Sequence, residues 1–255
     1  MLYIVKNKKM IGNLSEEEIY LPKEIKQAIT DNFNELKNSG LNIWNGKIMC
    51  VDKIIEDNQF VKVLCKKSDY AHYLYAEKNG LPVEYGCKSI SAGCVLETKD
   101  GYFVVGELGD NTSYPGMLQT TGGNIDEKND ITNGNIDFLN TIVREAKEEL
   151  NIDLKNEKLV SNHEITYMYI EEIDKQKGVR ILSKATIDMT AKELQEHFEK
   201  YNEYLINNNL ETEFERLHFL KKENAIEELN GLKNPKREYL VNILKYECEN
   251  NVVTL

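Results

Sequence analysis

Residues 144–152 read Arg-Glu-Ala-Lys-Glu-Glu-Leu-Asn-Ile. Apolar side chains recur at helical spacing ahead of and within this stretch, which predicts one amphipathic helix over residues 137–150. Glu145, Glu148 and Glu149 stand at i, i+3 and i+4, so their carboxylates share one face. The opposite face, expected to be buried, consists of Phe138, Leu139, Ile142, Val143, Ala146 and Leu150. Like charges on adjacent turns repel, and a divalent cation would relieve that repulsion because Mg²⁺ prefers carboxylate oxygens.

The acidic stretch resembles the signature of the Nudix hydrolases, G-x5-E-x7-R-E-U-x-E-E-x-G-U, in which U is aliphatic. The positions that match its second half are Arg144, Glu145, Ala146, Glu148, Glu149 and Ile152. Asn151 stands where the family has its closing glycine. Asparagine is the next best residue there, because the position past a helix end favours left-handed backbone.

The first half of the signature departs from the family pattern. Ile136 stands where the pattern has glutamate, and twelve residues rather than five separate it from Gly123. Residues 126–135 therefore read as a polar insertion. The candidates for the missing carboxylate are Asp126, Glu127 and Asp137. For Asp137 the alternative is a cap at the N-terminus of the helix, which is the commoner role of aspartate at such a position.

The resemblance implies an α/β fold, the Nudix α/β/α sandwich with a mixed sheet, and a metal-dependent hydrolase. Such an enzyme cleaves the pyrophosphate bond of a nucleoside diphosphate linked to another moiety, with Mg²⁺ or Mn²⁺ as cofactor. The implied catalytic residues are Arg144, Glu145, Glu148 and Glu149, and the implied metal ligands are Gly123 through its carbonyl, Glu145, Glu148 and Glu149. Glu148 and Glu149 are expected to be the main ligands. Glu145 would be a further ligand or accept the proton of water, and Arg144 would orient Glu148.

Substrate recognition is expected to lie outside the signature. Weak candidates for substrate contact are Asp126, Glu127 and Glu213. The family often has one more acidic residue late in the fold, and Glu211, Glu213 and Glu215 all remain candidates for it. An N-terminal extension and a lengthened signature resemble the layout of the animal Nudix hydrolases of UDP-glucose and UDP-galactose. A nucleotide sugar is therefore slightly favoured over ADP-ribose. The alternative is a catalytically weak or inactive Nudix-fold protein that binds or senses nucleotides.

Length and composition set the outer limits. A chain of 255 residues and 29.5 kDa suits two domains, expected as a small α+β domain over residues 1–83 and a Nudix domain over residues 84–255. A net charge of −11 argues against non-specific binding to nucleic acid. Without an apolar leader or an 18-residue apolar run, we expect a cytoplasmic protein that does not bind membranes. The cysteines expected to be reduced thiols are Cys50, Cys65, Cys87, Cys94 and Cys248.

The first predicted domain combines helices with strands. Its expected elements are a strand within residues 1–11, a helix from Pro22 to Gly40, a hairpin of strands 47–55 and 60–66, and a short helix over 69–75. Its aromatic side chains could either pack in a core or stack on a ligand, and packing is favoured. They are Trp44, Tyr70, Tyr73 and Tyr75. This aromatic content also makes a homodimer possible.

The second predicted domain brackets the acidic helix with strands. The expected strands are 90–97, 102–107, 118–121, 164–173, 179–187 and 212–220. The expected later helices are one from Thr190 to Tyr204, one over 224–229 and one over 236–246. Glycines at 122 and 123 would let the backbone approach a metal and a pyrophosphate without hindrance from a Cβ atom.

Overall fold

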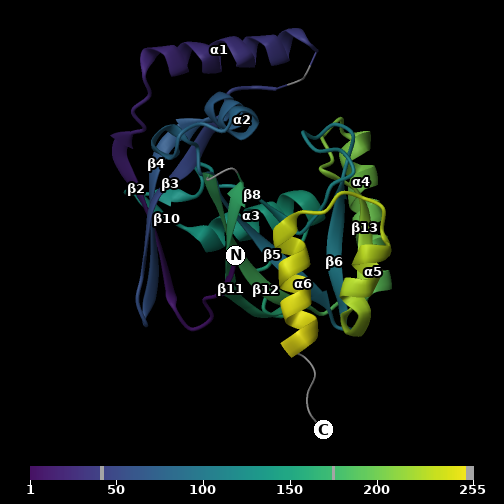
Figure 1. Cartoon of the computed structure of the whole chain (residues 1–255). Helices are drawn as coiled ribbons and strands as arrows, with labels where there is room; N and C mark the ends of the chain where they lie inside the picture. The colour runs from purple at the N-terminus through teal and green to yellow at the C-terminus, as the bar shows by residue number, and fades with distance from the viewer. Residues whose placement is uncertain (41–42, 174–175, 251–255) are drawn as a thin grey trace.

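The computed structural model describes residues 1–40, 43–173 and 176–250, which form two sheets and their helices (Figure 1). The large sheet runs in the order β1 (Leu2–Ile4), β11 (Val160–Ile173), β12 (Gln176–Ile187), β5 (Ile90–Thr98), β6 (Tyr102–Leu108) and β13 (Phe214–Lys221). Two short strands extend it, β7 (Leu118–Gln119) beside β6 and β8 (Thr121–Asn124) beside β5. The pairing of β12 with β5 is parallel and its neighbours are antiparallel, so the sheet is mixed, as predicted.

Helices cover both faces of the large sheet. One face carries α3 (Phe138–Leu150) and α4 (Ala191–Asn207), and the other carries α5 (Ala225–Gly231) and α6 (Glu238–Asn250) (Figure 1). Side chains along β5 alternate accordingly: Cys94 and Leu96 lie in the core with Ile142 of α3, while Val95 lies with Leu240 of α6. None of the described helices is both long and apolar enough to cross a bilayer.

The small sheet runs in the order β3 (Lys47–Glu56), β4 (Phe60–Asp69), β2 (Lys9–Glu18), β10 (Asn135–Ile136) and β9 (Ile131–Thr132). Its helices are α1 (Lys23–Asn38) and α2 (Tyr70–Asn79), followed by the 3₁₀ turn η1 (Val83–Tyr85). A second such turn, η2 (Lys222–Asn224), precedes α5. The single strand expected within residues 1–11 is in fact two, because Asn7 turns the chain with a φ of 70° between β1 and β2.

The two sheets exchange strands across the boundary predicted after residue 83. Strand β1 leaves the N-terminal region and pairs with β11 in the large sheet. The polar insertion ahead of α3 supplies β9 and β10, and β10 pairs with β2 of the small sheet. Two independent domains at that boundary stay a prediction, whereas two interlocked sheets are what the chain builds.

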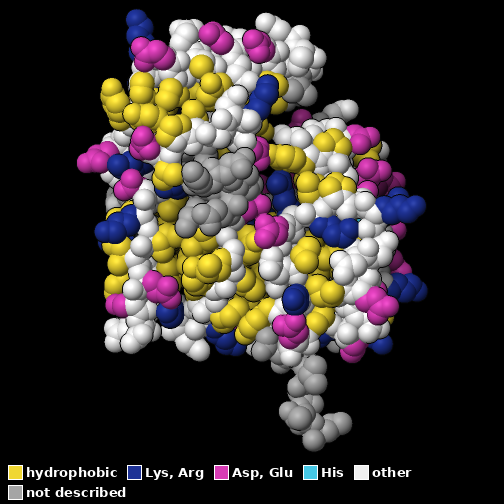
Figure 2. All heavy atoms as spheres, viewed as in Figure 1, with side chains coloured by type: hydrophobic (Ala, Val, Ile, Leu, Met, Phe, Trp, Pro, Cys, Tyr) yellow, Lys and Arg dark blue, Asp and Glu magenta, His cyan; other side chains and the backbone are white. Residues whose placement is uncertain are grey.

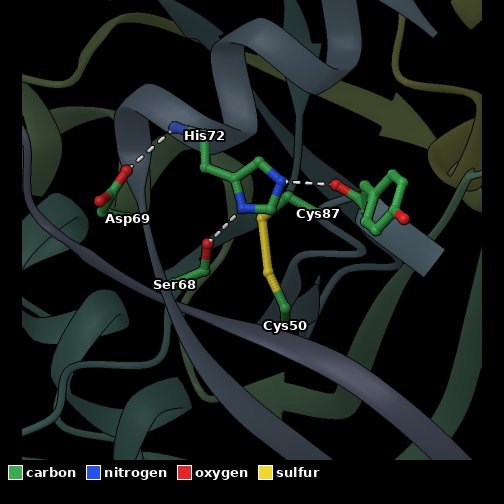
Figure 3. Close-up of a disulfide and its surroundings, with 6 residues drawn as sticks. Cys50, Ser68, Asp69, His72 and Cys87 are labelled. Atoms are coloured by element: carbon green, nitrogen blue, oxygen red, sulfur yellow. Dashed lines mark hydrogen bonds between the residues drawn. A yellow bond between two sulfur atoms is a disulfide. The ribbon is translucent and has the colours of Figure 1, made fainter. Parts of the chain in front are cut away.

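The cysteines depart from the expectation of five reduced thiols. Cys50 of β3 and Cys87 form a disulfide (Figure 3). Their approach follows from a long-range pairing, because Cys50 bridges Ser89 and Val51 N–H donates to the carbonyl of Lys88. Cys65 and Cys94 are free and buried as expected, and burial raises the pKa of each thiol to about 12.

A buried histidine lies beside this disulfide. His72 of α2 sits between the Ser68 hydroxyl and the Tyr85 carbonyl, at 2.7 Å from each (Figure 3). Both ring nitrogens therefore have partners, and burial lowers the pKa of the imidazole. These contacts join α2 to β4 and to η1.

Candidate functional site

The predicted acidic helix is confirmed as α3, Phe138–Leu150. Asp137 caps its N-terminus, accepting a hydrogen bond from Asn140 N–H at 3.0 Å. Asn151 ends it in the left-handed conformation, with φ 54°, as expected of the residue in the place of the closing glycine. Asp137 is thereby occupied as a cap and is not the missing carboxylate.

The buried face of α3 differs from the predicted one. Leu139 was expected in the core and is exposed, whereas Glu145 and Glu149 are buried. The reason lies in the neighbouring strand, because α3 packs against β8 and directs both carboxylates at its glycine backbone. Glu148 points outward, with 59% of its side chain exposed. The three glutamates therefore occupy two environments, although they share one helical turn.

Glu149 is the most deeply buried of the three glutamates of α3. Its Oε2 accepts hydrogen bonds from the Thr121 hydroxyl and from Gly122 N–H, the latter at 3.0 Å. Its Oε1 is buried without a hydrogen-bond partner. Burial, followed by repulsion from Glu213 and Glu145, raises the pKa of Glu149 well above its ordinary value. An unpartnered carboxylate oxygen of this kind is costly and is typical of a site that binds a ligand.

Glu213 reaches the same place from the segment just before β13. Its side chain is open to solvent, but it projects into a cavity with protein atoms on several sides. The protein atoms around its carboxyl raise its pKa by desolvation, and the charge of Glu148 adds to that rise, whereas the charge of Arg180 opposes it. Glu211 also lines the cavity, and Glu215 does not. Of the three late acidic residues that the sequence left open, Glu213 is the one beside Glu149.

Arg144 gathers the remaining carboxylates. Its Nη1 lies 2.8 Å from Glu145 Oε1 and 3.0 Å from Glu148 Oε2, and its Nη2 lies 2.9 Å from Asp130 Oδ2. Burial raises the pKa of Glu145 to about 7, with Arg144 opposing the shift and the charges of Glu213 and Glu148 adding to it. Glu145 is therefore a carboxyl that both gives up and accepts a proton near neutral pH.

The insertion contributes a residue that sequence reasoning missed. Asp130 is fully buried, accepts hydrogen bonds from Asn140 and from Asp126 N–H, and pairs with Arg144. The two candidates within the insertion lie elsewhere: Asp126 binds backbone amides of its own turn, and Glu127 pairs with Lys67 at 2.8 Å. The sequence offered one signal, an aspartate seven residues ahead of the predicted start of the helix, but nothing in its spacing separates it from its neighbours.

Ile136 occupies the place where the family pattern has glutamate, and the structure shows what it does there. Its side chain is buried in the main core, and its backbone pairs with Gly12 of β2. A Cβ atom on Gly12 would lie 2.7 Å from Ile136 Cβ, so the two strands are in close contact. An apolar residue is required here because the insertion folds into the small sheet rather than toward the carboxylates.

The carboxylates form one wall of a cavity of about 620 Å³ that lies between the two sheets. The backbone of Gly122 and Gly123 lies beside them, and Arg180 and Arg237 are the basic residues among its described lining. Each guanidinium lies over an aromatic ring at 4.3 Å, Arg180 over Tyr239 and Arg237 over Tyr114. Figure 2 shows a hollow on this face, between the α1–α2 layer and the α4–α6 side, with acidic and basic side chains at its margin.

The cavity is also lined by aromatic side chains from helices, connecting segments and one strand of both halves of the fold. They are Trp44, Tyr70, Tyr73, Tyr114, Tyr169 and Tyr239. Tyr73 and Tyr75 pack against the cores beside α2, as the sequence favoured, whereas Trp44 is 78% exposed. Packing was therefore the wrong interpretation for Trp44. The cavity brings together negative, positive and aromatic groups that are far apart in the sequence.

The donor set of the acidic wall suits a hard divalent cation. Within the residues described, no three His, Cys, Asp or Glu side chains stand together as a complete metal-binding group. Mg²⁺, however, is commonly held by one or two carboxylates together with waters and substrate phosphates. Glu149, with its unpartnered Oε1, and the adjacent Glu213 supply such a pair. Desolvation is the main cause of the raised pKa of both carboxyls, and repulsion between the two adds to it at Glu149.

Comparison with known proteins gives similarity of structure alone. No family model matches the sequence, and no curated protein matches it. The structure is similar to Nudix and MutT-type hydrolases over about 63% of the chain. An Ap4A hydrolase from C. elegans is 18% identical, with 61% of this chain and 92% of that chain covered and a TM-score of 0.39.

Two further solved structures have similar values. A MutT protein from Methanosarcina mazei is 14% identical, with 64% of this chain and 94% of that chain covered and a TM-score of 0.42. A Nudix hydrolase from Nitrosomonas europaea is 13% identical, with 63% and 88% covered and a TM-score of 0.40. We infer no activity, metal or substrate from similarities of this size.

Proposed function

We propose that this protein is a metal-dependent hydrolase that cleaves the pyrophosphate bond of a nucleoside diphosphate linked to a second moiety. One observation carries the proposal: the buried Glu149 has an unpartnered oxygen and a second carboxylate, Glu213, beside it in a large cavity. Two adjacent carboxylates, one of them buried, are unfavourable by themselves and become favourable around a divalent cation.

The roles proposed for the acidic residues follow from their surroundings. Glu149 and Glu213 would hold Mg²⁺ or Mn²⁺ at the cavity floor, with Glu145, Glu148 and the carbonyl of Gly123 beside them. When bound, the cation would supply positive charge that offsets the charge of the phosphate oxygens. Arg144 holds one oxygen of Glu145 and one of Glu148, which fixes both side chains on the same side of α3.

Glu145 is suited to accepting the proton of an attacking water. Its Oε1 is bound by Arg144, and the pKa of the carboxyl is raised to about 7. Oε2 is therefore the atom we assign to the proton, because Arg144 occupies the other oxygen. Attack of water on phosphorus breaks the P–O bond of the anhydride and gives a nucleoside monophosphate and a phosphorylated second moiety.

The basic residues support an anionic substrate. Arg180 and Arg237 each present a planar guanidinium to the cavity from over an aromatic ring. Arginine binds phosphate oxygens in a bidentate manner, and Arg237 Nε is buried without a hydrogen-bond partner. UDP-glucose and ADP-ribose both carry a diphosphate and are the first substrates to compare.

The proposal is tested by incubating the full chain with UDP-glucose, ADP-ribose, NADH and diadenosine polyphosphates, with Mg²⁺, with Mn²⁺ and with EDTA. Products are read by chromatography, so that release of a nucleoside monophosphate is seen directly. We expect turnover of at least one substrate that stops in EDTA. Glu149→Gln, which keeps the size of the side chain and removes its charge, should lower kcat by at least about a hundredfold.

A matched control keeps the test specific. Glu203→Gln removes one charge from an exposed position of α4 outside the cavity and should leave turnover unchanged. Full activity of Glu149→Gln would overturn the assigned roles. If calorimetry showed nucleotide binding but no substrate of the panel were turned over, the alternative of a catalytically inactive nucleotide-binding protein would be favoured. That alternative is motivated by Ile136 and by the insertion in the signature.

A further inference from the structure

Trp44 is the most exposed large apolar side chain of the chain's described residues, at 78%, and it lines the cavity of the carboxylates. It lies on the segment that leads into β3, in the region of the small sheet. An indole left in water is unfavourable, because its apolar surface is large. An exposed aromatic ring at the wall of a cavity is therefore a candidate contact for a ligand.

The backbone beneath Trp44 is shaped to support the ring. A Cβ atom on Gly46 would lie 2.5 Å from Cη2 and 2.6 Å from Cζ3 of the indole, so the ring rests against the glycine. The segment is held in turn by α2: Asn45 Oδ1 accepts from Ala71 N–H at 2.7 Å, and the Gly46 carbonyl accepts from Tyr70 N–H at 2.9 Å. The indole is thus supported on one side and open on the other.

The wall around Trp44 is tied to the loop that follows β6. Tyr70 OH bonds to Ser113 Oγ at 2.9 Å, and Tyr114 OH donates to Glu77 Oε2 at 2.8 Å. Tyr114 also carries Arg237 over its ring. The small sheet and the large sheet therefore meet along one side of the cavity, and Trp44 is held in place relative to the arginines.

We propose that Trp44 is the stacking surface for the base of a nucleotide whose phosphates lie toward the arginines and carboxylates of the same cavity. The choice of a base follows from the neighbouring groups. Arg180 and Arg237 suit phosphate oxygens, and the flat, supported indole suits the π-face of a ring joined to them. This inference rests on the proposed function for the position of the phosphates, and it deepens that proposal by giving the base a binding site.

The sequence supplies its own probe, because Trp44 is the single tryptophan of the chain. The full chain in EDTA is titrated with UMP and with AMP while indole fluorescence is recorded, and ribose 5-phosphate serves as the ligand without a base. We expect saturable quenching by at least one nucleotide and none by ribose 5-phosphate. Equal quenching by ribose 5-phosphate, or none by either nucleotide, overturns the stacking site.

Variants then separate stacking from structure. By calorimetry, Trp44→Ala should weaken binding of the quenching nucleotide on the order of tenfold, while Trp44→Phe, which keeps a ring, should retain most of the affinity. Tyr20→Ala removes an aromatic ring that is 77% exposed outside the cavity lining and should leave binding unchanged. Unchanged binding in Trp44→Ala would overturn the inference.

The two proposals fail separately in these experiments. Quenching and the Trp44 variants are read without metal or turnover, so a protein that hydrolyses nothing can still show the stacking site. Conversely, a hydrolase whose Trp44→Ala variant keeps its nucleotide affinity retains the proposed activity and loses only the assignment of Trp44. Affinity mostly retained in Trp44→Phe and lost in Trp44→Ala, with the Tm of both variants equal to that of the wild type, is the pattern that a merely structural role would not give.

Discussion

Asp130 and Arg144 form a buried ion pair, with Oδ2 and Nη2 at 2.9 Å and none of the Asp130 side chain exposed. The pair joins the insertion to the acidic helix. Nη1 of the same guanidinium remains free to contact Glu145 and Glu148. The insertion that interrupts the family signature is therefore attached to the site by a carboxylate of its own.

Removing Asp130 should destabilise the protein far more than removing Glu148, the exposed partner of Arg144. Asp130→Ala removes one acceptor each from Arg144, Asn140 and the Asp126 amide, and it leaves Arg144 without its buried counter-charge, so we expect a loss of about 3 kcal/mol in the free energy of unfolding. Glu148→Gln breaks a pair that is mostly in water and should cost less than about 1 kcal/mol. Urea unfolding followed by circular dichroism measures both, and equal losses would contradict the burial argument.

The metal-free protein should lose stability as the pH rises from acid to neutral. Burial raises the pKa of Glu145 from 4.5 to about 7, so the folded state binds more protons than the unfolded state between those values. The contribution of protonated Glu145 to the free energy of unfolding is thus fully present below about pH 4.5 and is lost as the pH rises through about 7. The raised pKa values of Glu149 and Glu213 act in the same direction.

Thermal unfolding in EDTA over this pH range checks the sign. Glu145→Gln, which cannot ionise, should flatten the dependence, and the exposed Glu203→Gln should leave it unchanged. A wild-type protein that gains stability from acid to neutral pH without metal would show that other groups dominate.

Mn²⁺ should stabilise the protein through Glu149 and Glu213. At a hundredfold excess over Kd, binding to the folded state alone adds about 2.7 kcal/mol, which is seen as a rise in Tm. Glu213→Gln should lose most of that rise, while Glu211→Gln and Glu215→Gln should keep it, because only Glu213 is beside Glu149. The comparison separates the three late acidic residues, and a loss confined to Glu211→Gln would reassign the ligand.

The two glycines of β8 should respond differently to alanine. A Cβ atom on Gly123 would lie 2.4 Å from Glu145 Oε1, at the mobile end of a side chain, so Gly123→Ala should fold and displace that carboxylate. A Cβ atom on Gly122 would lie 2.4 Å from Gly93 Cα, so the backbone itself must move. The φ of Gly122 is +141°, which an alanine rarely adopts. We expect Gly123→Ala to lose Mn²⁺ affinity by on the order of tenfold, with a Tm close to wild type.

Gly122→Ala, in contrast, should unfold at a markedly lower temperature, by roughly 3 °C or more. Differential scanning calorimetry with and without Mn²⁺ gives both quantities for each variant. A folded Gly122→Ala with normal Tm would mean that β8 and β5 separate more easily than their packing indicates.

Local pattern was sufficient for the acidic helix and its ends. Spacing of the apolar residues placed α3 within one residue of its observed start, Asp137 was suited to the cap, and Asn151 to the left-handed turn. The same holds for the strands that became β5 and β6, whose turn at Lys99, Asp100 and Gly101 follows from residues close in the chain. Such features depend on side chains within a few residues of one another, so the sequence alone determines them.

The site depended on contacts that no local pattern contains. Periodicity put the three glutamates on one face, but only packing against β8 buried Glu145 and Glu149 and left Leu139 in water. The sheets bring together segments that are far apart in the chain, and three pairs depend on this: Asp130–Arg144, Glu149–Glu213 and Cys50–Cys87. The same arrangement places Trp44 at the wall of the cavity. The sequence thus determined the elements and the acidic helix, whereas burial and long-range pairing determined which carboxylates share a charge environment.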